Sequence, residues 1–211
     1  QNTFFDEVAN ELGMVDSNAE YMRHPLAYLV EAADDICYTL IDFEDGINLG
    51  WISEEYALEF LIRLVKDSID TKKYNSLKHK TDRVAYLRAL SVNTLINDTV
   101  KIFLANEEKI LNGQFTKTLL SESVFKAQMK DIIDISVRKV YNSKEVIEKE
   151  LKGYQVIHKL LSVFIKASVN NQSDNTTALD DLVLSSLPQA YIHKDGNLYD
   201  QLLDISCFVA S

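Results

Sequence analysis

The chain has 211 residues, a length that suits one domain or one and a half, and its hydrophobic content of 46% is enough for a core. Its net charge of −10 argues against general nucleic-acid binding through a basic face, and it means that an anionic ligand needs local cations. Six glycines and two prolines are few for this length, which favours long helices over sheets and turns.

Hydrophobic periodicity predicts helices along most of the chain. In chain order they cover residues 3–12, 25–45, 54–68, 81–111, 121 or 123 to 140, 144–169 and 197–211. Ser53 and Thr81 are the expected N-caps of the third and fourth helices, and Gly113 is expected to end the fourth in left-handed backbone. Residues 72–80 and 170–177 are predicted to be loops. The predicted fold class is all-α, a multi-helix bundle.

The cysteines and the hydrophobic segments indicate the compartment. Cys37 and Cys207 form no CxxC or zinc-ligand spacing, as expected of small hydrophobic residues in a reducing compartment. The most apolar long segment, residues 154–169, contains three basic side chains and lacks the ~20 uninterrupted apolar residues that a membrane span needs. We therefore expect a cytoplasmic protein with no membrane-spanning helix.

The helix predicted over residues 25–45 carries an acidic stripe on an otherwise apolar surface. Pro25 suits its first turn, where a missing N–H has no cost. Five acidic residues fall within about 100° of its circumference, namely Glu31, Asp34, Asp35, Asp42 and Asp45. The rest is largely apolar, which predicts burial among other helices: Leu29, Val30, Ala33, Ile36, Cys37, Leu40, Ile41 and Phe43. The stripe is either the solvent-exposed face of a core helix or the binding site of a cation or a polar ligand.

Three residues of this helix form one slanted row, because Tyr38 and Asp42 follow Asp34 at i+4 and i+8. Such a row would suit the wall of a nucleotide site. It offers a carboxylate that can bind a hard cation, followed by an aromatic hydroxyl and a second carboxylate. The alternative is that Tyr38 fills the core of a purely structural helix.

Residues 24–38, with the sequence HPLAYLVEAADDICY, are followed by DFEDG at 42–46. This string closely resembles the deoxyguanosine-triphosphate triphosphohydrolases, which are HD-domain metal-dependent phosphohydrolases. A weaker similarity covers residues 81–90 and continues through residues 95, 96, 103 and 113. The resemblance implies the C-terminal part of an HD-domain-type helical fold. Residues 1–50 would then be the last part of the catalytic core, and residues 51–211 a C-terminal helical domain.

The resemblance also implies an activity and roles for particular residues. Enzymes of this family convert a deoxynucleoside triphosphate, typically dGTP, to the deoxynucleoside and inorganic triphosphate with a divalent metal. The metal is expected to be Mg²⁺ or Mn²⁺, or another transition metal. Asp34 matches the distal metal ligand, and Tyr38 and Asp42 match residues that contact the deoxyribose. The family also forms homo-oligomers, often hexamers.

The family's other metal ligands have no counterpart in the chain. They are a His and a His-Asp pair, but His24, His79, His158 and His193 are followed by Pro, Lys, Lys and Lys. No catalytic residue is therefore assigned in this segment, and one carboxylate does not hold an ion that takes about six ligands. The chain starts at Gln1 and ends within an apolar helical pattern. We expect it to be the C-terminal portion of a larger enzyme and inactive alone.

Two other functions stay open. The missing His-Asp pair suits a non-catalytic helical regulatory or assembly module, and another HD phosphohydrolase could act on a different nucleotide. Four basic side chains near the motifs could face a phosphate. The expectation is that Arg23 and His24 instead close a loop onto the helix, and that Arg83 and Arg88 form structural salt bridges.

Overall fold

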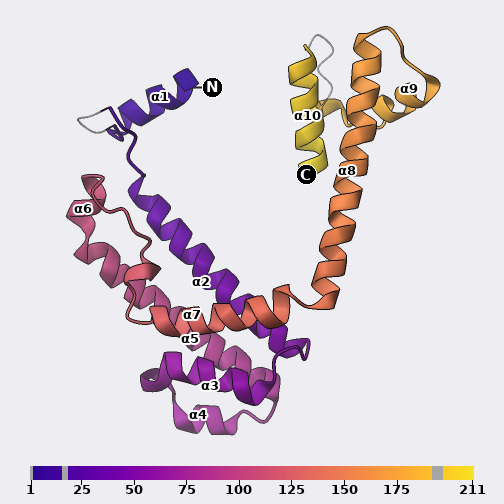
Figure 1. Ribbon diagram of the computed structural model, residues 1–211. Coiled ribbons are helices and arrows are strands. Elements are labelled where there is room, and N and C mark those ends of the chain that lie inside the picture. The colour runs from indigo at the N-terminus through magenta and orange to yellow at the C-terminus, as the bar shows by residue number, and fades with distance from the viewer. Residues whose placement is uncertain (1, 16–18, 192–196) are drawn as a thin grey trace. The chain divides into compact units, whose positions relative to one another are not determined.

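The computed structural model describes residues 2–15, 19–191 and 197–211, and within these it is an all-α bundle without strands (Figure 1). The α-helices are α1 (Asn2–Glu11), α2 (Pro25–Asn48), α3 (Glu54–Val65), α4 (Thr71–Ser76), α5 (Lys80–Ala105), α6 (Glu107–Leu111), α7 (Lys126–Ser136), α8 (Lys144–Gln172), α9 (Ala178–Ser185) and α10 (Leu198–Ala210). The shorter elements are η1 (Lys66–Ser68), η2 (Leu120–Glu122), η3 (Val137–Tyr141) and η4 (Gln189–Tyr191). The predicted fold class is confirmed.

The chain divides into two compact units, residues 1–143 and 144–211. The boundary that we predict after residue 50 concerns the catalytic core of the family and stays a prediction. Among the described residues, no helix combines the length and the apolar character that crossing a membrane would require.

The first unit is built around α2, which packs against α5, α7 and η3, while α3 packs against α5 and α7. Its main core consists of aliphatic side chains and one phenylalanine, all nearly inaccessible: Ile36, Leu40, Phe43, Ile47, Ile52, Ala57, Leu61, Leu64, Val65, Val84, Leu87, Leu95, Met129, Ile132, Ile135 and Val140. A smaller cluster surrounds Tyr28, whose hydroxyl donates a hydrogen bond to the carbonyl of Phe115.

Local signals explain where α2 begins and how closely it is packed near its end. The Nδ1 atom of His24 accepts the N–H of Leu26 at 3.2 Å, and Pro25 occupies the first turn. Near the other end, a Cβ placed on Gly46 would lie 2.6 Å from Cγ2 of Val140 and 2.8 Å from Cδ1 of Ile52. Gly46 therefore permits a close approach of α2 to η3, a π-helical turn.

Several predicted boundaries are wrong, and at α4 and α9 the cause is local polar capping. Residues 71–76 form α4, not a loop, because the carboxylate of Asp70 accepts the N–H groups of Lys72 and Lys73. The N-cap of α5 is His79, so Thr81 lies inside the helix. The helix α9 was not predicted at all. Short helices begun by polar caps lack the apolar period on which the prediction relied.

The face of α2 that carries Asp34 is open, contrary to the prediction of a helix buried on most sides. Val30 is 68% exposed and Ile41 is 45% exposed, and Cys37 is exposed as well. The buried residues of α2 lie on the side that meets the other helices of this unit. Because α5, α7 and η3 cover only that side, the apolar residues beside Asp34 have no helix over them in the described residues.

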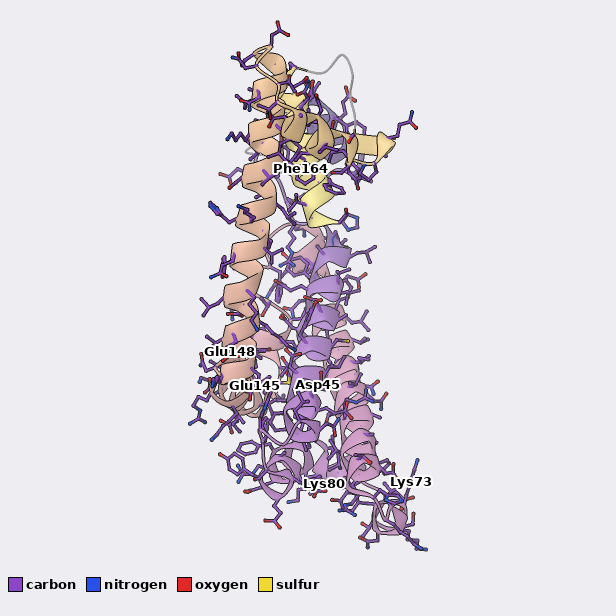
Figure 2. All side chains as sticks on the ribbon, turned by 90° about the vertical axis from the view of Figure 1, so that its right-hand side faces the viewer. Asp45, Lys73, Lys80, Glu145, Glu148 and Phe164 are labelled. Carbon is purple, nitrogen blue, oxygen red and sulfur yellow. The ribbon has the colours of Figure 1, made fainter. Side chains whose placement is uncertain are left out.

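The second unit is a small helical assembly in which α8 packs against α9 and α10 (Figure 1). Its core centres on Phe164 (Figure 2), Leu187 and Ile205. The N-terminus of α9 is held by a capping box of Thr177 and Asp180, in which each side chain bonds the backbone of the other residue.

The burial of α2 is tested by a matched pair of neighbouring residues. Leu40 is 1% exposed and Ile41 is 45% exposed, so Leu40→Ala should destabilise the first unit by about 2–5 kcal/mol and Ile41→Ala by less than about 0.5 kcal/mol. The measurement is urea unfolding followed by the fluorescence of Trp51, the single tryptophan, which packs against the core of this unit. Equal losses in the two variants would contradict the one-sided packing.

The pH dependence of the second unit is tested at Asp180. Hydrogen bonds from Asn170, and then from Thr177, hold the pKa of this carboxyl below its ordinary value of 3.8. The stabilisation is therefore complete above the ordinary pKa and is lost as the pH falls through the lowered one. Thermal unfolding of the native chain and of Asp180→Asn, followed from pH 6 to pH 2, should converge at low pH. A difference that stays constant with pH would exclude this role for the carboxylate.

Candidate functional site

The candidate row Asp34, Tyr38 and Asp42 lies along α2 on or beside its open face. Asp34 is exposed, Tyr38 is 63% exposed and Asp42 is half-buried. Because α2 runs unbroken from residue 25 to 48, the i, i+4 and i+8 spacing puts the three side chains in one row. Tyr38 is not core filler in the described structure, since most of its side chain is accessible.

Asp42 has a partner that the sequence did not reveal. The hydroxyl of Tyr141, in η3, donates a hydrogen bond to Oδ2 of Asp42, although the two residues are 99 positions apart. Burial, and then this hydrogen bond, raise the pKa of Tyr141 to about 12, so its hydroxyl keeps its proton. The bond fixes the orientation of the Asp42 carboxylate. No pattern in the sequence pairs the two residues; their proximity results from the packing of η3 against α2.

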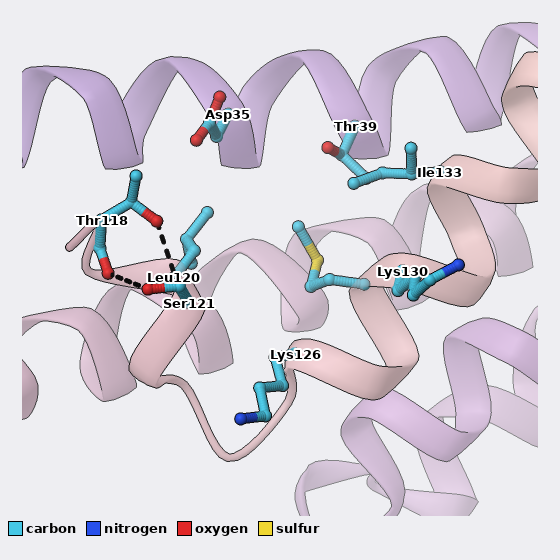
Figure 3. Close-up of a pocket in the computed structure, with 9 residues that line it drawn as sticks. Asp35, Thr39, Thr118, Leu120, Ser121, Lys126, Lys130 and Ile133 are labelled. Carbon is cyan, nitrogen blue, oxygen red and sulfur yellow. Dashed lines mark hydrogen bonds between the residues drawn. The ribbon is translucent and has the colours of Figure 1, made fainter.

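Asp35 is exposed like Asp34, but it lies on the side of α2 next to α7. It lines a pocket of about 300 Å³ between α2 and α7, together with Thr39 and residues near η2 (Figure 3). Burial, and then the charges of Glu31 and Asp34, raise the pKa of the Asp35 carboxyl. Adjacent aspartates on one helix therefore have different surroundings, with Asp34 on the open face and Asp35 beside the bundle.

The basic side chains near the motifs make structural contacts, as expected. Arg23 lies 2.9 Å from the carboxylate of Glu31 and stacks over the ring of Tyr28 at 4.5 Å. Arg88 lies 2.6 Å from the carboxylate of Glu44, which belongs to α2.

Arg83 has the same kind of role at the start of α5. It donates to the carbonyl of Leu77 at 3.1 Å and to Glu54 at 3.3 Å. Glu54 also pairs with Lys80 at 3.3 Å. These contacts tie the segment after α4 to α3, which leaves Arg83 engaged within the fold.

The described residues do not hold a metal ion by themselves. Nowhere among them do three or more His, Cys, Asp or Glu side chains gather in a way that could bind one. The neighbours of Asp34 one turn away on α2 are Val30, Glu31, Cys37 and Tyr38, and the one carboxylate among them, that of Glu31, pairs with Arg23. His193 lies outside the described residues. Asp34 can therefore supply one ligand, and the described residues do not complete the coordination of a divalent ion.

Comparison with curated proteins shows similarity over the whole chain. The chain is 30% identical, over its full length, to a deoxyguanosinetriphosphate triphosphohydrolase-like protein of Synechocystis, of which it covers 47%. It is 28% identical to a like-named protein of Listeria monocytogenes, over 90% of the chain and 43% of the relative. A deoxyguanosinetriphosphate triphosphohydrolase of Serratia proteamaculans is 29% identical over 78% of the chain, which covers 35% of that protein.

No family model matches the chain. The curated relatives nevertheless agree with one another in name, and each alignment includes most of the chain. The resemblance that the motifs indicated is therefore confirmed. Along its whole length the chain is related to the deoxyguanosine-triphosphate triphosphohydrolase family, and it spans about half the length of the curated relatives that it matches.

Proposed function

We propose that the chain is the part of a dGTP triphosphohydrolase that contributes the distal metal ligand and the sugar contacts of the active site. The observation that carries this proposal is the row of Asp34, Tyr38 and Asp42 on an unbroken helix, within the segment that most closely resembles the family. The names of the relatives support the reaction class, which is hydrolysis of a deoxynucleoside triphosphate to the deoxynucleoside and triphosphate.

Each residue of the row has a proposed task that follows from its chemistry. Asp34 offers a hard oxygen ligand to a divalent ion, Mg²⁺ or Mn²⁺, whose other ligands come from outside this chain. Tyr38 presents its ring to the deoxyribose, and Asp42 accepts a hydrogen bond from a sugar hydroxyl. Tyr141 keeps the Asp42 carboxylate in place through the hydrogen bond described above.

The open face of α2 supports this arrangement. Val30, Ile41 and Tyr38 around Asp34 are each 45% or more exposed, so this face of α2 is accessible to a ligand or to other parts of the full-length protein. We propose that residues 1–50 complete the catalytic core of the full-length protein and that the missing ligands approach Asp34 over this face. Residues 51–211 then form the accompanying helical domain. We also propose a homo-oligomer that acts in the cytoplasm, where its nucleotide substrate is found.

The metal ligand is tested in the full-length product of the gene. Asp34→Ala should remove binding of Mn²⁺, followed by electron paramagnetic resonance, and should lower dGTP hydrolysis by at least about 1,000-fold, because a ligand to the metal is lost. Asp45→Ala removes the same charge from the same face of α2 and should leave both unchanged.

Two further results test which residues form the row and whether the full-length protein is a hydrolase. Asp35→Ala should retain Mn²⁺, since Asp35 lies about 100° around the helix from Asp34, on the side next to α7, and loss of the metal in this variant would show that the row is assigned to the wrong residues. A full-length protein that hydrolyses no deoxynucleoside triphosphate would favour a non-catalytic helical module. Hydrolysis of a different nucleotide would keep the enzyme class and change the substrate.

The role of Tyr141 is tested by removing only its hydroxyl. Tyr141→Phe frees the Asp42 carboxylate, so we expect the KM for dGTP to rise about tenfold, which corresponds to one hydrogen bond to a charged group. Tyr56→Phe is the matched control, since the ring of Tyr56 packs against Phe60 in α3. A fall in thermal stability with an unchanged KM would assign Tyr141 to the fold alone.

A further inference from the structure

We propose that the N-terminal half of α8, residues 144–161, pairs in the antiparallel direction with the same segment of a second copy of the chain. This inference extends the homo-oligomer proposed above by naming one of its contact surfaces. The surface belongs to the second unit, and no residue of the candidate row takes part in it. Its test therefore needs neither nucleotide nor metal.

The N-terminal half of α8 has no packing partner within its own unit. The helix packs against α9 and α10, and its buried residues all lie in its last third: Phe164, Ala167 and Ser168. Figure 2 shows Glu145 and Glu148 near one end of the helix and Phe164 toward the other. No side chain is buried from residue 147 to residue 160. This half of α8 is therefore accessible to a partner.

The same half of α8 is amphipathic. Apolar side chains recur at steps of four and three residues, at Ile147, Leu151 and Tyr154, which are 42%, 58% and 76% exposed. His158 and Leu161 continue this spacing. Most charged residues of this half lie on the opposite side of the helix: Glu145, Lys149, Lys152 and Lys159. Steps of four and three are the contact positions of two helices that pair side by side, and one polar residue among them can fix the register.

The order of these residues suits a second copy in the antiparallel direction. About a two-fold axis between residues 152 and 153, Leu151 of one copy faces Tyr154 of the other, and Ile147 faces His158. The two accessible segments then match in length, because residue 144 lies opposite residue 161. The buried part of α8, from Phe164 onward, stays outside the pairing, so α9 and α10 keep their places.

Charge and area favour a second copy that binds reversibly. In this register Glu148 lies opposite Ile157 and Glu150 lies opposite Gln155, so no two acidic side chains meet although the chain has a net charge of −10. The paired segments would bury on the order of 1,000 Å² in total, which is at the low end for specific interfaces. We therefore expect a dimer that dissociates in the micromolar range.

The surface is tested on the 211-residue chain by sedimentation equilibrium from submicromolar to high micromolar concentration. Leu151→Asp should weaken dimerisation by at least about 100-fold, because each copy then buries an unpaired charge. Val156→Asp is the matched control. Val156 is 57% exposed, like Leu151, but it lies on the far side of α8, so the dimer should be unchanged. Circular dichroism should show native helix content in both variants, since both residues are exposed.

The direction of pairing is tested by disulfide formation, in a chain whose Cys37 and Cys207 are replaced by serine. Ile147→Cys and His158→Cys should form a disulfide-linked dimer when the two variants are mixed and oxidised. Neither should do so alone, because antiparallel pairing sets the two copies of either residue about 16 Å apart along the axis.

Three results would overturn the proposal. They are a native chain that stays monomeric at every concentration, a dimer that Leu151→Asp weakens no more than Val156→Asp does, and disulfides that form within the separate cysteine variants. None of these measurements involves turnover, so the proposed hydrolase activity is judged separately by its own assay.

Discussion

One-sided burial of α2 determines both the core of the first unit and the geometry of the candidate site. Leu40, Phe43 and Ile36 point into the bundle and are almost inaccessible, which fixes the rotation of the helix about its axis. Once that rotation is fixed, the period of 3.6 residues decides where every other side chain of α2 points. Asp34 and Tyr38 must then lie on the open side, and Asp35 must lie beside α7. The difference between the two adjacent aspartates thus follows from the packing of three apolar residues.

The same packing brings a distant part of the chain to the site. Gly46 lets Val140 and Ile52 come within a distance that a Cβ would not allow, and this contact holds η3 against α2. Tyr141 follows Val140 by one position and reaches Asp42, one turn before Gly46. π-Helical turns are rare and occur frequently at functional sites. Here the turn contains the tyrosine that orients a carboxylate of the proposed sugar site.

Features that depend on hydrophobic periodicity and on local helix-capping residues could be predicted from the sequence. Features that depend on contacts with other helices could not. The helices around Pro25 and Asn197 begin where predicted, because a proline in the first turn and an asparagine N-cap are local signals. Gly113 adopts the predicted left-handed backbone with φ +69°. The exposure of Val30 and Ile41 was not predictable in this way, since an apolar residue does not reveal whether another helix covers it. Tyr141 was missed for a similar reason, because its role depends on a contact 99 positions away.

Charge places a further constraint on what the proposed site can do. Among the acidic residues of α2, Glu31 and Glu44 have arginine partners and Asp42 accepts a hydrogen bond from Tyr141. Asp34, Asp35 and Asp45 have no ion pair in the described part of the chain. Unpaired carboxylates on one helix repel one another and any nucleotide phosphate. A divalent ion at Asp34 would relieve both repulsions. The acidic face of α2 can therefore accept an anionic nucleotide only together with a cation, which makes the metal a condition of binding as well as of hydrolysis at the proposed site.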